Sequence, residues 1–181
     1  MQTILLVRHG RSAHVHSGFV DRAAFDRWRE AYESAGIDER DQPPAALKAL
    51  ASTSAITVAS TAPRAVQSAE LLDPERDIPA SPLLRELDLV PPNVRVRMPL
   101  LGWALAIGVR RIIQAVSPLE LQRAREAAEW LVGLAERHET VLAVTHASFR
   151  SLLASQLVGR GWRCEIPSGR SRHWSVWSFH R

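Results

Sequence analysis

Two histidines and two arginines each come at or soon after the end of a short apolar run of the sequence. Arg8 and His9 follow the first run, Arg64 comes soon after the second, and His146 directly follows the third. Guanidinium groups donate paired hydrogen bonds to phosphate oxygens. A neutral imidazole is a nucleophile at phosphorus, and a protonated one stabilises the negative charge that develops there. These residue types indicate phosphate binding and phosphoryl transfer, provided that the fold brings them together.

The apolar runs that precede these residues are predicted to be buried parallel strands. They cover residues 3–7, 55–59 and 141–145, and each is followed by small or polar residues and then by a helical pattern. Ligands of open parallel sheets bind beyond the carboxyl ends of the strands. The histidines and arginines are therefore expected at one rim, together with helix N-termini that add N–H donors. A last run over residues 173–179 is expected to add a closing strand.

Five helices are expected, with clear start and stop signals. Gly36 follows the first helix, and Ser117 with Pro118 begins the longest one. The expected ranges are 21–34, 44–51, 62–72, 117–138 and 148–158.

The segment from 87 to 116 shows no clear strand or helix period, and it is interpreted as an insertion. Its apolar part, residues 98–109, has three interpretations: a buried helix, a lid over the site, or a contact surface for a second copy or a membrane. Burial within the insertion is the default. Trp103, Arg95 and Arg97 would face substrate if the segment is a lid.

Composition and charge restrict the class of protein. A chain of 181 residues with 46% hydrophobic and 23% charged residues is typical of one globular domain, here 1–181, and excludes a wholly disordered or collagen-like chain. A single cysteine, Cys164, excludes an internal disulfide. Basic residues exceed acidic ones by 23 to 19, but they are interleaved with acids, so a mixed surface is favoured over nucleic-acid binding.

The sequence shows no targeting segment and no membrane span. The longest mostly apolar stretch, residues 98–109, is far shorter than the roughly 20 residues that a spanning helix needs. We therefore expect a cytoplasmic protein. The sequence does not indicate an oligomeric state.

Four segments resemble, in the same order, the motifs of the histidine phosphatase superfamily, also called the phosphoglycerate-mutase-like family. Together with the first strand they span residues 3 to about 158. The segments are Leu6-Val7-Arg8-His9-Gly10, Ser60-x-x-x-Arg64-Ala65-x-Gln67-Ser68-Ala69, Leu84-Arg85-Glu86-Leu87 and Val144-Thr145-His146.

The resemblance implies a three-layer αβα sandwich with a mostly parallel central sheet, and phosphoryl transfer through a phosphohistidine. His9 would be the nucleophile, and Arg8, Arg64 and His146 would complete the phosphate pocket. Glu86 would donate a proton to the leaving group. The family needs no metal or other cofactor for this chemistry.

Three further residues near the motifs are candidates for the site. Asp88 is a rival to Glu86 as the proton donor. Ser12 either donates to the phosphate or caps the turn that follows it. Ala147, directly after the second histidine, is included among the substrate-binding residues, although many family members have glycine there.

The sequence also departs from the family pattern. Many members have asparagine where this chain has Val15, and the neighbouring His14 or His16 could take its place. A metal site at His14-Val15-His16 is disfavoured because no third ligand is evident. The mutase-type Gly-x-Trp-Glu-Gly segment is absent, and residues 88–92 stand there instead.

The predicted function is a metal-independent phosphatase acting on a phosphate monoester, either a small molecule or a phosphoprotein. A phosphoglycerate-mutase-like mutase is the second hypothesis. A catalytically idle phosphate-binding module is the third, and it is disfavoured because such a module does not need both histidines.

Overall fold

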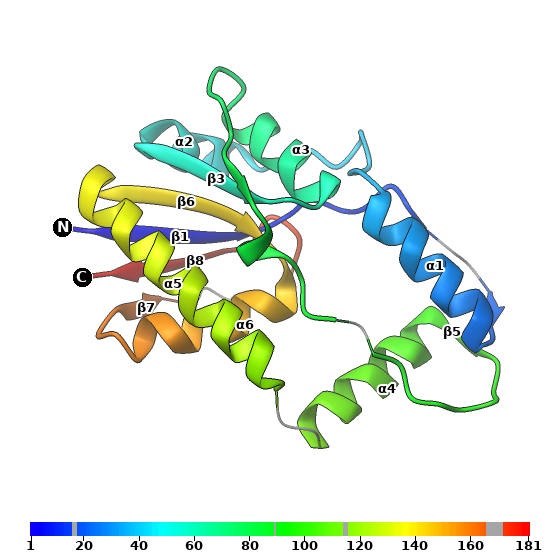
Figure 1. The fold of residues 1–181 in the computed structure, drawn as a ribbon. Helices are drawn as coiled ribbons and strands as arrows, with labels where there is room; N and C mark the ends of the chain where they lie inside the picture. The colour runs from blue at the N-terminus through cyan, green and yellow to red at the C-terminus, as the bar shows by residue number, and fades with distance from the viewer. Residues whose placement is uncertain (16–17, 89, 114–115, 166–171) are drawn as a thin grey trace.

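A six-stranded sheet runs through the centre of the molecule (Figure 1). The computed structural model describes residues 1–15, 18–88, 90–113, 116–165 and 172–181. The strands of the sheet are β1 (Thr3–Arg8), β3 (Ile56–Ser60), β4 (Ala80–Ser81), β6 (Thr140–Thr145), β7 (Arg163–Glu165) and β8 (Val176–His180).

The strand order of the sheet is β4-β3-β6-β1-β8-β7. The pairs β4–β3, β3–β6 and β6–β1 are parallel, whereas β8 pairs antiparallel with β1 and β7 pairs antiparallel with β8. The sheet is therefore mostly parallel, as expected, and the predicted closing strand is present. Because β8 runs opposite to β1, the residues that precede β8 lie at the carboxyl end of β1.

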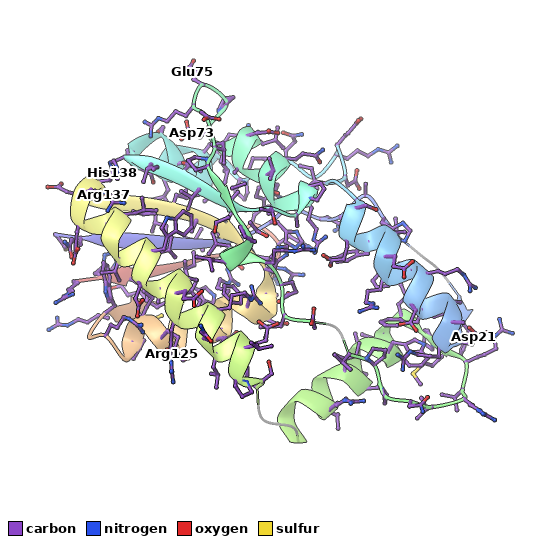
Figure 2. All side chains as sticks on the ribbon, in the orientation of Figure 1. Asp21, Asp73, Glu75, Arg125, Arg137 and His138 are labelled. Atoms are coloured by element: carbon purple, nitrogen blue, oxygen red, sulfur yellow. The ribbon has the colours of Figure 1, made fainter. Side chains whose placement is uncertain are left out.

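All five expected helices are present, each within two residues of its predicted bounds. Asp21, labelled in Figure 2, caps the first helix by accepting a hydrogen bond from the Ala24 N–H, and Ser117 caps the longest helix in the same way from Glu120. The helices are α1 (Arg22–Ser34), α2 (Ala45–Thr53), α3 (Pro63–Leu72), the 3₁₀ turn η1 (Pro82–Leu84), α4 (Leu100–Ile113), α5 (Pro118–His138) and α6 (Ala147–Val158).

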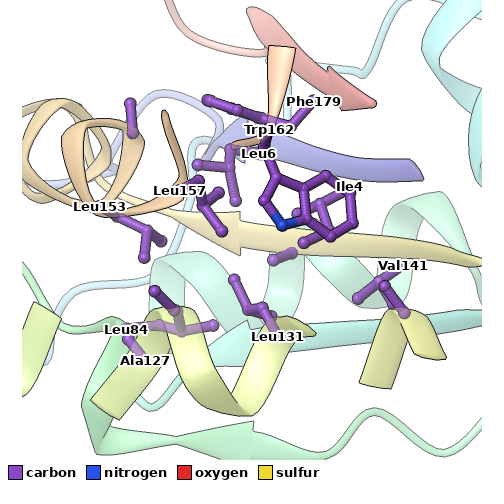
Figure 3. Packing of buried hydrophobic residues seen from close by; sticks show 14 of the residues in the cluster. Ile4, Leu6, Leu84, Ala127, Leu131, Val141, Leu153, Leu157, Trp162 and Phe179 are labelled. Carbon is purple, nitrogen blue, oxygen red and sulfur yellow. The ribbon is translucent and has the colours of Figure 1, made fainter. Parts of the chain in front are cut away.

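Helices cover both faces of the sheet and give the predicted three layers. Successive residues of β1 point to opposite faces, so Ile4 and Leu6 enter one core and Leu5 and Val7 enter the other. The first core packs against α5 and α6, and the second packs against α2 and α3. Figure 3 shows the first core, where the indole of Trp162 lies among the aliphatic side chains of the sheet and of α5 and α6.

The predicted insertion contains a 14-residue helix, α4, which the sequence pattern did not reveal. Trp103 and Ile107 on its inner side are buried, but Leu101, Leu105 and Val109 are exposed on its outer side. Apolar residues on both sides of a helix remove the one-sided period by which amphipathic helices are recognised. Burial, which was the default interpretation of this segment, is confirmed for its inner side.

Helices α1 and α4 lie beyond the carboxyl ends of β1 and β6 (Figure 1). They are joined by a two-stranded ribbon of β2 (Phe19–Val20) and β5 (Met98–Pro99). A third small core of Val20, Phe25, Trp103 and Ile107 holds them together. This pair of helices thus faces the rim at which the candidate functional residues are expected.

Candidate active site

His9 follows β1 and is almost completely buried, at 2% exposure. Its Nδ1 lies 2.6 Å from the backbone oxygen of Gly10. Because a carbonyl oxygen only accepts hydrogen bonds, Nδ1 carries the proton and Nε2 keeps its lone pair. Burial lowers the pKa of His9 to about 3, and the nearby charges of Arg64 and Arg8 act in the same direction. The imidazole is therefore neutral at pH 7, as a nucleophile must be.

His146 follows β6 and lies beside His9, with 4.9 Å between the ring centroids and the rings edge to face. Its Nε2 is 2.9 Å from Ser60 Oγ, and its Nδ1 is buried without a hydrogen-bond partner among the described residues. Burial first, and then His9 and Arg64, hold the pKa of His146 well below its ordinary value. A dianion bound here would favour the protonated imidazole and give it a partner.

Arg64, in the first turn of α3, is completely buried. One terminal nitrogen donates to the backbone oxygen of Tyr32 at 2.9 Å, the other lies 3.2 Å from a carboxylate oxygen of Glu33, and the guanidinium stacks 4.3 Å over the Tyr32 ring. Its Nε is buried and has no partner among the described residues. A buried cation with a donor to spare is suited to bind an anion.

Arg8 is the last residue of β1, and its positive charge acts on both His9 and His146. Burial lowers the pKa of Arg8, against the opposing influence of Tyr32 and Glu86, and Arg8 in turn lowers the pKa of both His9 and His146. The structure thus brings together the two histidines and two arginines that the sequence singled out.

Glu86 lies at the N-terminus of α6, where no side chain of the helix itself forms a cap. Its Oε1 accepts from the N–H groups of Leu87 at 2.9 Å and Phe149 at 2.8 Å, and its Oε2 accepts from that of Ser148 at 3.2 Å. A carboxylate is favoured at this end of a helix by the unpaired N–H groups and the helix dipole. Glu86 is therefore fixed within one helical turn of His146, whereas Asp88 is exposed.

The remaining predicted residues differ in what the structure shows of them. Ser12 Oγ accepts from the N–H of His14 at 3.2 Å, so it caps the turn, which is one of its two predicted roles. Ala147 is the first residue of α6. His16 lies outside the described residues, within which there is also no group of three or more metal-ligating side chains.

Trp103 does not fulfil the lid interpretation, whereas Arg95 and Arg97 lie at the surface. Trp103 is fully buried, stacks on Phe25 and donates from Nε1 to the backbone oxygen of Val20 at 3.1 Å. Arg97 donates to the backbone oxygen of Phe19, and Arg95 is exposed. Trp103 is a core residue of the α1–α4 pair and does not face substrate.

Two residues at this rim were missed by the sequence analysis, which took them as part of the closing strand. The His173 ring lies 5.8 Å from that of His9, and burial together with Arg8 lowers the pKa of His173 to about 4. Trp174 packs so closely on Gly10 that a Cβ there would be 2.4 Å from the indole. The direction of β8 would have revealed them. A closing strand that runs antiparallel to β1 begins at this rim, so the residues before it lie beside His9.

Trp174 also ties the His9 loop to the rest of the molecule. It has a positive φ of 61°, its N–H donates to the Arg8 backbone oxygen, and its indole donates to Asp41 at 3.0 Å. The same Asp41 oxygen accepts from the backbone N–H of Arg11. A left-handed tryptophan is strained, so these contacts hold it in place against the loop that carries His9.

Comparison with known proteins identifies the fold. No protein-family model and no curated protein sequence matches the chain. Among solved structures, the chain is similar to a mycobacterial hydrolase (16% identity, TM-score 0.62, 100% of this chain and 98% of the other). It is also similar to a phosphoserine phosphatase from Entamoeba histolytica (11%, 0.60, 99% and 91%) and to a mycobacterial glucosyl-3-phosphoglycerate phosphatase (17%, 0.57, 87% and 80%).

The two named phosphatases are members of the histidine phosphatase superfamily, and the chain shares their fold. The resemblance predicted from the four motifs is thereby confirmed at the level of the fold. No helix in the described ranges is long and apolar enough to cross a membrane.

Proposed function

We propose that the protein is a metal-independent phosphatase that hydrolyses a phosphate monoester through a phosphohistidine on His9. The observation that carries this proposal is the 2.6 Å bond from His9 Nδ1 to the Gly10 oxygen. It leaves the lone pair of Nε2 on a neutral ring, beside His146 and within the field of Arg8 and Arg64. The solved phosphatases that share this fold support the same class of reaction.

In the first step, Nε2 of His9 attacks phosphorus in line with the ester bond. The P–N bond forms as the P–O bond breaks, and the departing oxygen takes a proton from Glu86 to leave as an alcohol. Arg8, Arg64 and protonated His146 stabilise the charge on the equatorial oxygens.

In the second step, water attacks the phosphohistidine. Its proton goes to the Glu86 carboxylate, the P–N bond breaks, and the electron pair returns to Nε2 of His9. Inorganic phosphate is released and the starting protonation state is restored.

The hydrogen bonds of Glu86 indicate which of its oxygens would hold the proton that is transferred. Oε1 accepts two N–H bonds, whereas Oε2 accepts one, from Ser148. Each carboxyl oxygen has two lone-pair directions, so Oε2 is the oxygen with room for a proton. We therefore assign Oε2 as the donor, in preference to the exposed carboxylate of Asp88.

The substrate class that we propose is a small-molecule phosphate ester or a phosphoprotein, in the cytoplasm. The compartment is supported by the single cysteine, Cys164, which is free. A mutase would need a bound acceptor for the phosphoryl group, and an idle module would need no nucleophile.

Hydrolysis of p-nitrophenyl phosphate in excess EDTA tests this function. We expect turnover to be unaffected by the chelator and to fall on the order of 10⁴-fold or more in His9→Ala, because the nucleophile is lost. His138→Ala is the matched control, since His138 is exposed in the last turn of α5. Activity that EDTA abolishes and a divalent metal restores would contradict the proposal.

A further inference from the structure

An apolar cavity of about 240 Å³ lies between α1, α4 and the beginning of α6. Ser148 is part of its wall, and the other lining residues are aromatic, aliphatic or glycine. They are Phe25 and Trp28 of α1 and Leu100, Ala104, Ile107 and Gly108 of α4. Such a cavity suits an apolar group of about the size of one or two rings or a short alkyl chain.

One wall of the cavity leads to the phosphate-binding arginine. Phe25, Trp28 and Tyr32 lie three and four residues apart, so they share one face of α1. The rings of Trp28 and Tyr32 are stacked with 5.1 Å between centroids, and the Arg64 guanidinium lies 4.3 Å over the Tyr32 ring. A continuous row of aromatic rings thus connects Arg64 with the cavity.

The opposite wall leads to the proposed proton donor. Ser148 lines the cavity, and its backbone N–H is 3.2 Å from Glu86 Oε2. A phosphate ester held by Arg64 therefore has, in one direction, both the donor for its bridging oxygen and an apolar space for the group attached to that oxygen.

Two buried polar atoms on the α1 side of the cavity have no hydrogen-bond partner among the described residues. They are Nε1 of Trp28 and Nε2 of His14, whose rings lie 5.8 Å apart. Buried polar atoms in native proteins are normally paired. They could pair with a single polar atom on an otherwise apolar leaving group, whereas the aliphatic lining residues offer no such partner.

A second cavity, of about 310 Å³, also reaches Glu86, but its charged groups are already paired. Glu33 binds both Arg64 and Arg85 at 3.2 Å. Arg123 binds Glu120 and donates to backbone oxygens of the loop that carries Glu86. Walls of paired charges give an apolar leaving group little gain from burial, whereas the apolar cavity gives the full gain.

We propose that the apolar cavity between α1 and α4 binds the leaving group, and that the substrate is the phosphate monoester of an apolar alcohol or phenol. This inference rests on the proposed phosphatase function. It predicts that esters of sugars and other polyols are poor substrates, because their hydroxyl groups would be buried without partners.

A series of n-alkyl phosphates tests the inference, since its members have nearly equal leaving groups and differ in apolar size. We expect kcat/KM to rise about fourfold for each added methylene, hence about 60-fold from methyl to butyl phosphate. Glycerol phosphate should fall about 10²-fold below propyl phosphate.

Filling the cavity locates the effect. Ala104→Phe places a ring in the cavity from the exposed edge of α4, and the butyl-to-methyl ratio of kcat/KM should collapse to near one. Gly108→Leu is a second cavity-filling variant, because a Cβ there meets no atom within 4 Å. Leu105→Phe is the matched control on the outer side of the same helix, where Leu105 is 63% exposed, and it should retain the wild-type ratio.

The outcomes separate the two proposals. A flat alkyl series, with methyl phosphate still hydrolysed in a His9-dependent way, overturns the inference and leaves the phosphatase function standing. A steep series that neither Ala104→Phe nor Gly108→Leu changes overturns the location of the pocket. No turnover of any phosphate ester overturns the phosphatase function and this inference with it.

Discussion

The two ends of the candidate site are built differently. The phosphate end contains His9, His146, Arg8 and Arg64, and the leaving-group end is the apolar cavity between α1 and α4. His9 and His146 stand at the ends of neighbouring strands, whose positions are fixed by the register of β1 with β6 and by the cores on both faces of the sheet. The other end is formed by α1 and α4, which are joined by a two-stranded ribbon and one small core. The difference teaches that the two histidines are positioned by the sheet, whereas the proposed leaving-group cavity belongs to a smaller unit that touches the phosphate end through Tyr32 and Arg64.

Glu86 lies where the two ends meet, and its replacement should give the largest selective effect. Glu86→Gln should lower hydrolysis of an alkyl phosphate by about 10²–10⁴-fold, because an alkoxide needs a proton to leave. Hydrolysis of p-nitrophenyl phosphate should change much less, because nitrophenolate leaves without one. Steady-state kinetics on the two substrates measures this selectivity.

Asp88→Asn is the control for the assignment of the proton donor. Asp88 is exposed, and it should be replaceable with no selective loss. If Asp88→Asn instead shows the selective loss and Glu86→Gln is silent, the donor is Asp88, and the role assigned to Oε2 of Glu86 is wrong.

Trp103 tests whether the α1–α4 end is held by its own core. Trp103→Ala should lower the free energy of unfolding by about 3–5 kcal/mol, since it removes a fully buried aromatic side chain. Leu105→Ala, on the exposed side of the same helix, should change the free energy of unfolding by only about 0.5 kcal/mol or less. Urea denaturation measures both.

The same variant sharpens the comparison between the two ends. Below its unfolding transition, Trp103→Ala should bind inorganic phosphate as the wild type does, because Trp103 packs on Phe25 and bonds to Val20, neither of which is a proposed phosphate-binding residue. Phosphate binding that weakens in parallel with stability would show that the two ends form one cooperative unit.

The pH dependence of stability belongs to the phosphate end. His9 has a pKa of about 3 in the folded chain and an ordinary value of 6.5 when unfolded. Between pH 6.5 and 3 the unfolded chain binds the additional proton, so stability falls as the pH falls, by up to about 1.4 kcal/mol per pH unit. His9→Asn should make this slope shallower, whereas His138→Asn should not. An unchanged slope in His9→Asn would contradict the buried neutral state of His9.

Sequence reasoning predicted that His9 and His146 lie together because the signals for this are local. A buried parallel strand followed directly by His9 or His146 places that residue at the carboxyl edge, whatever the rest of the chain does. The position of His173 and Trp174 could not be read in this way, because it depends on the antiparallel pairing of β8, a long-range contact.

The leaving-group end was predicted only in part. The helical spacing of Phe25, Trp28 and Tyr32 predicted α1 correctly, but the partner that covers this face was not identified. Helix α4 has apolar residues on both sides, and it contains Gly102 and Gly108, which disfavour helix. Its inner face could be recognised only once Trp103 was seen packed on Phe25.

Trapping of the covalent intermediate tests the central claim most directly. Brief reaction with a ³²P-labelled alkyl phosphate, an alkaline quench and peptide mapping should find one phosphoryl group per chain on His9. The label should be stable in alkali, labile in acid and absent from His9→Ala. Label on a serine, or turnover in His9→Ala at a rate comparable with the wild type, would contradict the account.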